Sequence, residues 1–137
     1  MWYTYALLSA VFAALTAILA KIGIKGVSSD LATAIRTVVI LVVAWGIVFV
    51  RDRPADMLTF SPRTWLFLTL SGVATGLSWL CYFRALQLGK VSQVAPVDKL
   101  SVALAIGLSV AFLGETLTLK TAIGAALIVG GTLVLVF

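Results

Sequence analysis

Three residues in the stretch from 91 to 119 have types and spacing that could handle charge inside a membrane. Pro96, Asp98 and Lys99 stand close together in an otherwise apolar segment that is long enough to cross a bilayer. A charged group in hydrocarbon costs roughly 2.5 to 3.5 kcal/mol on insertion scales. An acid and a base that remain in such a helix should therefore face protein or water, so this stretch is the first candidate for a transport path.

Pro96 removes one backbone donor, which predicts a kink or local unwinding beside the charged pair. Asp98 and Lys99 point about 100° apart on a regular helix, which disfavours a pair between them. We expect the counter-ion of Asp98 to come from the substrate or another helix; a purely structural ion network is the alternative. Ser101, three residues after Asp98, joins the candidate path. The candidate partners are basic residues expected toward one membrane surface: Lys21, Arg36 and Arg84.

A second polar face recurs at helical spacing in the stretch from 62 to 88. It consists of Ser71, Thr75, Ser78 and Tyr82, and Trp79 stands next to it. Such a stripe faces neighbouring helices or a substrate, and the sequence leaves both open. Ser78, Trp79 and Tyr82 are therefore further candidates for the path. For Arg36, snorkelling to the surface and facing an aqueous pocket are equally compatible with its position.

The elements that must position these residues are apolar helices. The chain has 137 residues, of which 62% are hydrophobic, and a mean hydropathy of +1.17, against roughly 45 to 50% apolar residues in soluble domains. These values predict an all-α membrane protein in one domain, residues 1–137. Five transmembrane helices are expected at about residues 2–24, 31–50, 62–88, 92–113 and 120–137.

Several functions are excluded by residue content. The chain has no histidine and one cysteine, Cys81, and its apolar helices hold no convincing nucleophile and base. We therefore expect no enzyme, no metal site and no cofactor. The net charge of +5 is spread over many helix ends rather than gathered in a stripe, so contact with lipid head groups is expected and nucleic acid is not.

Basic residues give no firm orientation: four lie on each side when the deeper Arg36 and Lys99 are left out, and counting those two would favour the side opposite the N-terminus as cytoplasmic. The N-terminal side has Arg51, Arg53, Arg63 and Lys120, and the opposite side has Lys21, Lys25, Arg84 and Lys90. A small unit with so little bias can insert both ways and pair head to tail, which builds an inverted repeat from one sequence. We therefore expect dual topology and an antiparallel homodimer.

Glycines suited to close helix packing occur in two pairs. Gly72 and Gly76 form a GxxxG pair, and Gly124 and Gly131 share one face of the last helix. We expect both pairs at packing or dimer contacts. The last helix is otherwise smooth and uncharged beyond Lys120, which is more typical of association than of a pathway.

Residues 85–137 resemble the C-terminal part of the five-helix repeat of EamA-type transporters in the drug/metabolite transporter superfamily. The resemblance is carried by A-P-V near the start of the fourth helix, by the L-G-E-T-L-T turn and by I-G-A-A-L-I-V-G-G in the fifth. It implies one half of an inverted-repeat, ten-helix fold, in which the first four helices surround a cavity and the fifth is peripheral. It also implies transport of a small organic metabolite across the cytoplasmic membrane.

The type of substrate follows from a difference within that superfamily. Its small multidrug exporters carry an acid in the first helix, which this chain lacks, so an anionic, zwitterionic or neutral metabolite is favoured over a cation. The preferred function is a secondary transporter that works by alternating access. Two alternatives stay open: a flippase or scramblase of a phosphate-bearing lipid carrier, and a non-transporting membrane subunit of a hetero-oligomer.

Overall fold

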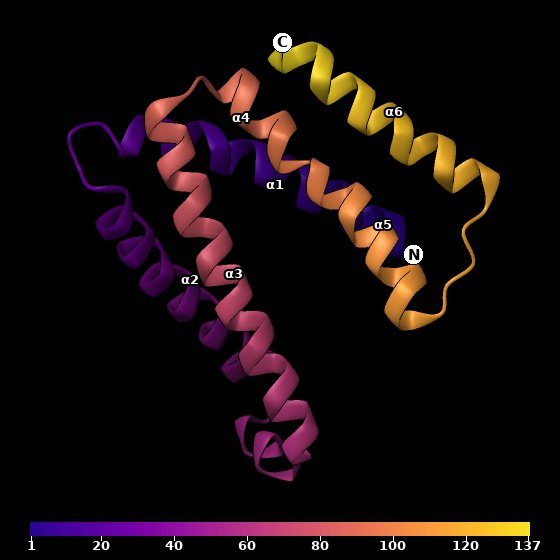
Figure 1. Ribbon diagram of the computed structural model, residues 1–137. Coiled ribbons are helices and arrows are strands. Elements are labelled where there is room, and N and C mark those ends of the chain that lie inside the picture. The colour runs from indigo at the N-terminus through magenta and orange to yellow at the C-terminus, as the bar shows by residue number, and fades with distance from the viewer. The chain divides into compact units, whose positions relative to one another are not determined.

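The computed structural model describes all 137 residues, and every regular element in it is a helix (Figure 1). The elements are α1 (Trp2–Gly23), α2 (Ser29–Arg51), the short 3₁₀ helix η1 (Pro54–Thr59), α3 (Pro62–Leu88), α4 (Val91–Asp98), α5 (Leu100–Leu113) and α6 (Leu119–Val136). Five segments are long and apolar enough to cross a membrane: α1, α2, α3, α6 and the stretch Val91–Leu113 that contains α4 and α5. The predicted fold class, an all-helical protein with five spans, is confirmed.

Side-chain caps and glycines set the helix ends. Ser28 accepts a hydrogen bond from the Leu31 N–H at 3.2 Å, and Thr118 caps α6 in the same way. Because Ser28 is the cap, α2 begins two residues earlier than predicted. Gly114 ends α5 with a φ of +69°, and Gly26 occupies the turn after α1 with a φ of +74°; both are left-handed conformations that favour glycine.

The chain divides into two compact units, which are described separately. One comprises Met1–Leu19 and Leu88–Phe137 and is called the α4–α6 unit; the other comprises Ala20–Gln87 and is called the α2–α3 unit. Within the α4–α6 unit, α6 follows a short connection and packs against both α4 and α5 (Figure 1).

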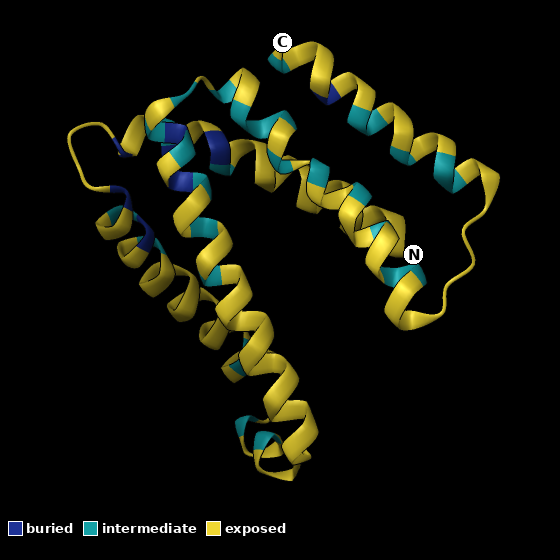
Figure 2. Cartoon of the chain, in the orientation of Figure 1, coloured by how far each residue is buried: buried dark blue, intermediate teal, exposed yellow.

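The buried residues of the α2–α3 unit gather where α1 ends, α2 begins and α3 ends (Figure 2). Phe83 and Leu86 of α3 are almost wholly buried, and Ala20 and Ile24, from the end of α1 and the turn that follows, are buried as well. The buried hydroxyl of Thr33 donates to the carbonyl of Ser29 at 2.8 Å, so its polarity is satisfied. Most other apolar side chains on the spans are exposed in the single chain, which leaves wide surfaces for lipid or another protein.

Candidate transport site

Arg36 lies on an aromatic platform inside the α2–α3 unit. Its guanidinium carbon is 4.6 Å from the ring centroid of Phe83 and 5.3 Å from that of Trp79. The two rings are one turn apart on α3, so they present adjacent faces to one cation. Tyr82 stands edge-on to Phe83, with 6.2 Å between the ring centroids. The structure thus brings together three predicted residues, Arg36, Trp79 and Tyr82.

Arg36 is within a span and forms no ion pair with an acidic side chain. It lies seven residues after the start of α2, about 10 Å along the helix axis. The predicted alternatives were snorkelling and an aqueous pocket, whereas the structure shows the side chain lying against α3. Phe83, which the sequence analysis did not single out, is the closer ring. Phe83 stands four residues after Trp79, and this helical spacing could have indicated in the sequence that the two rings share one face of α3.

Polar contacts tie the end of α3 to the turn between α1 and α2. The Lys21 ammonium donates to the carbonyl of Leu86, and the Gln87 amide donates to the carbonyl of Val27 at 2.6 Å. Arg84 in turn donates to the side-chain oxygen of Gln87 at 3.1 Å. Lys21 therefore supplies a cation at the carbonyl end of α3. In this structure Lys21 and Gln87 connect the end of α3 to the end of α1 and the turn after it, and Arg84 contacts Gln87 within α3.

The α4–α6 unit contains the predicted interruption of the fourth span. Residue 99 separates α4 from α5, and its N–H lies within hydrogen-bond distance of the carbonyls of Ala95 (3.3 Å) and Pro96 (3.0 Å), so the helix tightens locally here. Pro96 has no N–H to donate to the carbonyl of Ser92, so the regular hydrogen-bond pattern is weakened in the turn before Lys99. The break lies eight residues after Val91, about 12 Å into the span. The predicted irregularity beside the charged pair is confirmed.

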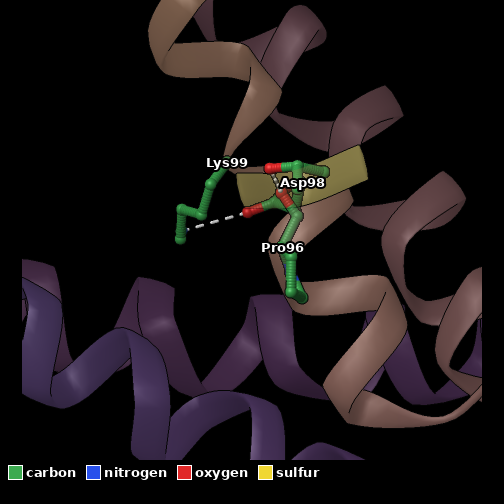
Figure 3. Close-up of polar contacts among 4 residues, drawn as sticks. Pro96, Asp98 and Lys99 are labelled. Carbon is green, nitrogen blue, oxygen red and sulfur yellow. Dashed lines mark hydrogen bonds and ion pairs between the residues drawn. The ribbon is translucent and has the colours of Figure 1, made fainter. Parts of the chain in front are cut away.

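The prediction for the counter-ion of Asp98 was wrong. The Lys99 ammonium lies 3.1 Å from Asp98 Oδ2, so the two neighbours pair with each other (Figure 3). Lys99 keeps helical backbone angles (φ −71°, ψ −10°), so the two side chains still leave the helix in different directions, but the long lysine side chain bends back to the carboxylate. The Lys99 side chain is 56% exposed and the Asp98 side chain is 35% exposed. The pair is therefore neutral overall and accessible from outside the unit.

The last helix contributes one polar contact to this break that the sequence analysis missed. Thr132 is 5% exposed, and its hydroxyl lies within hydrogen-bond distance of the carbonyls of Ile128 (2.8 Å) and Pro96 (3.2 Å). Thr132 is the one polar side chain in the apolar run that ends the chain, which was the available signal. The helix α6 thus packs on the interrupted span, in addition to any association role.

The remaining predicted residues have no partners that assign them a role. Ser78 and Ser101 are exposed, and Thr75 on the same stripe as Ser78 donates to the carbonyl of Ser71, within its own helix. A Cβ added at any of the four glycines expected in packing would meet nothing within 4 Å. These glycines are Gly72, Gly76, Gly124 and Gly131. Pathway contacts for the serines and dimer contacts for the glycines stay predictions.

Five spans, one of them interrupted at a proline and an ion pair, define an integral multi-pass membrane protein. The sequence matches the EamA-like transporter family over residues 1–137, and the chain belongs to that family. It is a membrane transporter and not an enzyme, as the sequence predicted.

Two relatives extend this comparison. An uncharacterized transporter in the cobO 3′ region of Sinorhizobium sp. is 53% identical over 134 residues, which cover 98% of this chain and 95% of the relative. An uncharacterized protein of Methanocaldococcus jannaschii is 39% identical over 66 residues, 48% of each chain. Both relatives are therefore close to this chain in length. No solved structure matches.

Proposed function

We propose that this chain is a secondary transporter of a small anionic, zwitterionic or neutral metabolite, and that it works by alternating access as an antiparallel homodimer in the cytoplasmic membrane. The observation that carries the proposal is Arg36, a cation inside a span that lies on two aromatic rings and has no acidic partner. A charge in this position is costly to keep without a function.

Arg36 suits a carboxylate or phosphate group of the substrate. A guanidinium presents planar donors that bind such groups with two parallel hydrogen bonds, and a low-polarity environment strengthens them. The rings of Trp79 and Phe83 restrict the guanidinium to one side, so it is held in place before the substrate arrives. A neutral or zwitterionic substrate would use the same donors for a carbonyl or carboxylate.

A cationic substrate finds less support. The first span has no acidic residue. Asp98 is the only acidic residue away from the ends of the spans, and it is paired with Lys99. Protonation of Asp98 would break that pair, so we assign Asp98 as the group linked to proton movement. The interrupted helix around it is the part that changes shape, as discontinuous helices do in other transporters.

The homodimer explains how so small a chain could enclose a path. The chain corresponds to one five-helix repeat, and the family resemblance implies two inverted repeats in a complete transporter. The exposed Asp98–Lys99 pair and the exposed apolar faces need cover from protein or water. Basic residues are balanced between the two sides, which permits insertion in both orientations. A two-fold axis in the membrane plane would then relate two equivalent states.

Uptake into proteoliposomes tests the proposal, with labelled amino acids, small carboxylates and a quaternary ammonium cation as the panel. We expect uptake of an acid or amino acid, and loss of that uptake in Arg36→Gln. The matched control is Arg63→Gln, because Arg63 also lies over a ring, that of Phe67 at 5.8 Å, but at the start of α3. Uptake of the cation alone, or equal loss in both variants, contradicts the proposal. Movement of labelled lipid without solute uptake would establish the flippase alternative instead.

A further inference from the structure

A second site lies in the α2–α3 unit, at the opposite end of its helices from the Lys21 contact. An open hollow of about 490 Å³ forms between the end of α2, the 3₁₀ helix η1 and the start of α3. This volume is within the range of about 300 to 1,000 Å³ that is usual for small-molecule sites. None of the residues proposed for transport lines it.

Aromatic rings and unpaired carboxylates line this hollow together. The rings are those of Trp45, Phe60 and Trp65, and the centroids of the last two are 6.4 Å apart. Asp52 and Asp56 also line it, and neither carboxylate forms an ion pair or a side-chain hydrogen bond within the chain. Aromatic faces and carboxylates are the groups that bind an ammonium ion, by cation–π attraction and by opposite charge.

Arg53 completes the lining with a positive charge. It has no ion-pair partner in the chain, and a guanidinium suits a phosphate. Two acids, a base and aromatic walls are thus complementary to a molecule that carries a phosphate and an ammonium a short distance apart. An anion alone would be repelled by the two carboxylates.

The position of the hollow identifies the source of such a molecule. Its residues connect two spans, so they lie at the membrane surface, and tryptophans at span ends are typical of the head-group region. We propose that this hollow, which we call the head-group site, binds the head group of a zwitterionic phospholipid, with its ammonium between the carboxylates and rings and its phosphate at Arg53. The proposal does not rest on the transported substrate.

Lipid retention tests the head-group site. The protein is placed in nanodiscs of equal parts phosphatidylethanolamine and phosphatidylglycerol, and the lipids that remain bound are counted by native mass spectrometry. We expect the wild type to retain phosphatidylethanolamine preferentially, by about tenfold, since a charge pair and a cation–π contact act together. The double variant Asp52→Asn with Asp56→Asn should lose this preference.

The matched control is Glu115→Gln. Glu115 lies in a different loop, which is expected on the same side of the membrane, and its exposed carboxylate forms no ion pair. It should retain the preference. Trp65→Leu keeps all charges but removes an aromatic ring, so it should reduce the preference for phosphatidylethanolamine severalfold. This variant tests the head-group site if the double variant does not fold. An unchanged preference in the folded double variant, or in Trp65→Leu if the double variant is unfolded, overturns the proposal. Displacement of the lipid by millimolar soluble phosphoethanolamine would overturn the assignment to a lipid.

Discussion

The two units handle charge inside the membrane in different ways. In the α2–α3 unit, Arg36 has aromatic neighbours and no acidic partner. In the α4–α6 unit, Asp98 and Lys99 neutralise each other at a break in the helix. An unmatched charge in a regular helix is suited to binding, whereas a matched pair at an interruption is suited to a change of conformation. We therefore propose that the first unit binds the substrate and that the second couples transport to proton movement.

The largest expected effect comes from Asp98→Asn. This change removes both the partner of Lys99 and the group that we propose to take up the proton. Uptake driven by a proton gradient should therefore fall at least tenfold, which corresponds to a free-energy difference of about 1.4 kcal/mol. Exchange of labelled for unlabelled substrate without a gradient should be reduced much less. Both rates are measured in proteoliposomes. Gradient-driven uptake equal to that of the wild type would show that coupling does not involve this pair.

Arg36→Lys should affect binding rather than turnover. Lysine keeps the charge but lacks the planar donors of a guanidinium, so KM should rise about tenfold while the maximal rate changes little. Initial rates over a range of substrate concentrations give both values. Arg63→Lys is the control and should change neither. A lower maximal rate with an unaltered KM would reverse the assignment of the two units.

Pro96→Ala tests the interrupted helix without a change in charge. Alanine supplies the N–H that proline lacks, and in a helix interior it is more favourable than proline by about 3 kcal/mol. The span should therefore become one continuous helix. We expect a melting temperature higher by a few degrees and a transport rate lower by a factor of about five. The melting temperature is measured by thermal unfolding in detergent, and the transport rate is measured by uptake with the same preparation, for both Pro96→Ala and the wild type. A variant that is more stable and equally fast would mean that the break is not needed for transport.

Thr132→Val should have the smallest effect. Valine has nearly the shape of threonine but cannot donate to the carbonyl of Pro96, so about 0.5 to 1.5 kcal/mol of stability should be lost. Chemical unfolding in detergent measures the difference. Thr75→Val is the control, because the Thr75 hydroxyl bonds only within its own helix, and it should cost less. Equal losses in the two variants would show that the contact between α6 and the break contributes little.

The sequence predicted the features that depend on neighbouring residues. Apolar runs marked the spans, and Pro96 marked the irregular turn in the fourth of them. Each of these follows from backbone chemistry within a few residues.

Contacts between distant residues could not be predicted in the same way. The pairing of Gln87 with Val27, and the position of Arg36 over Phe83, depend on which turn of α3 faces α2. The Asp98–Lys99 pair was missed for a different reason: the prediction compared only the directions in which the two side chains leave the helix and did not allow for the length of the lysine side chain.

The measurement that tests the central claim most directly is the orientation of the chain in the membrane. A reporter at the C-terminus is read from both compartments, in the wild type and in variants with one lysine added to either side. If two inverted copies form the path, the wild type should give equal signals from both sides, and each added lysine should drive the signal to one side. A wild type with every C-terminus on the same side would contradict the antiparallel dimer.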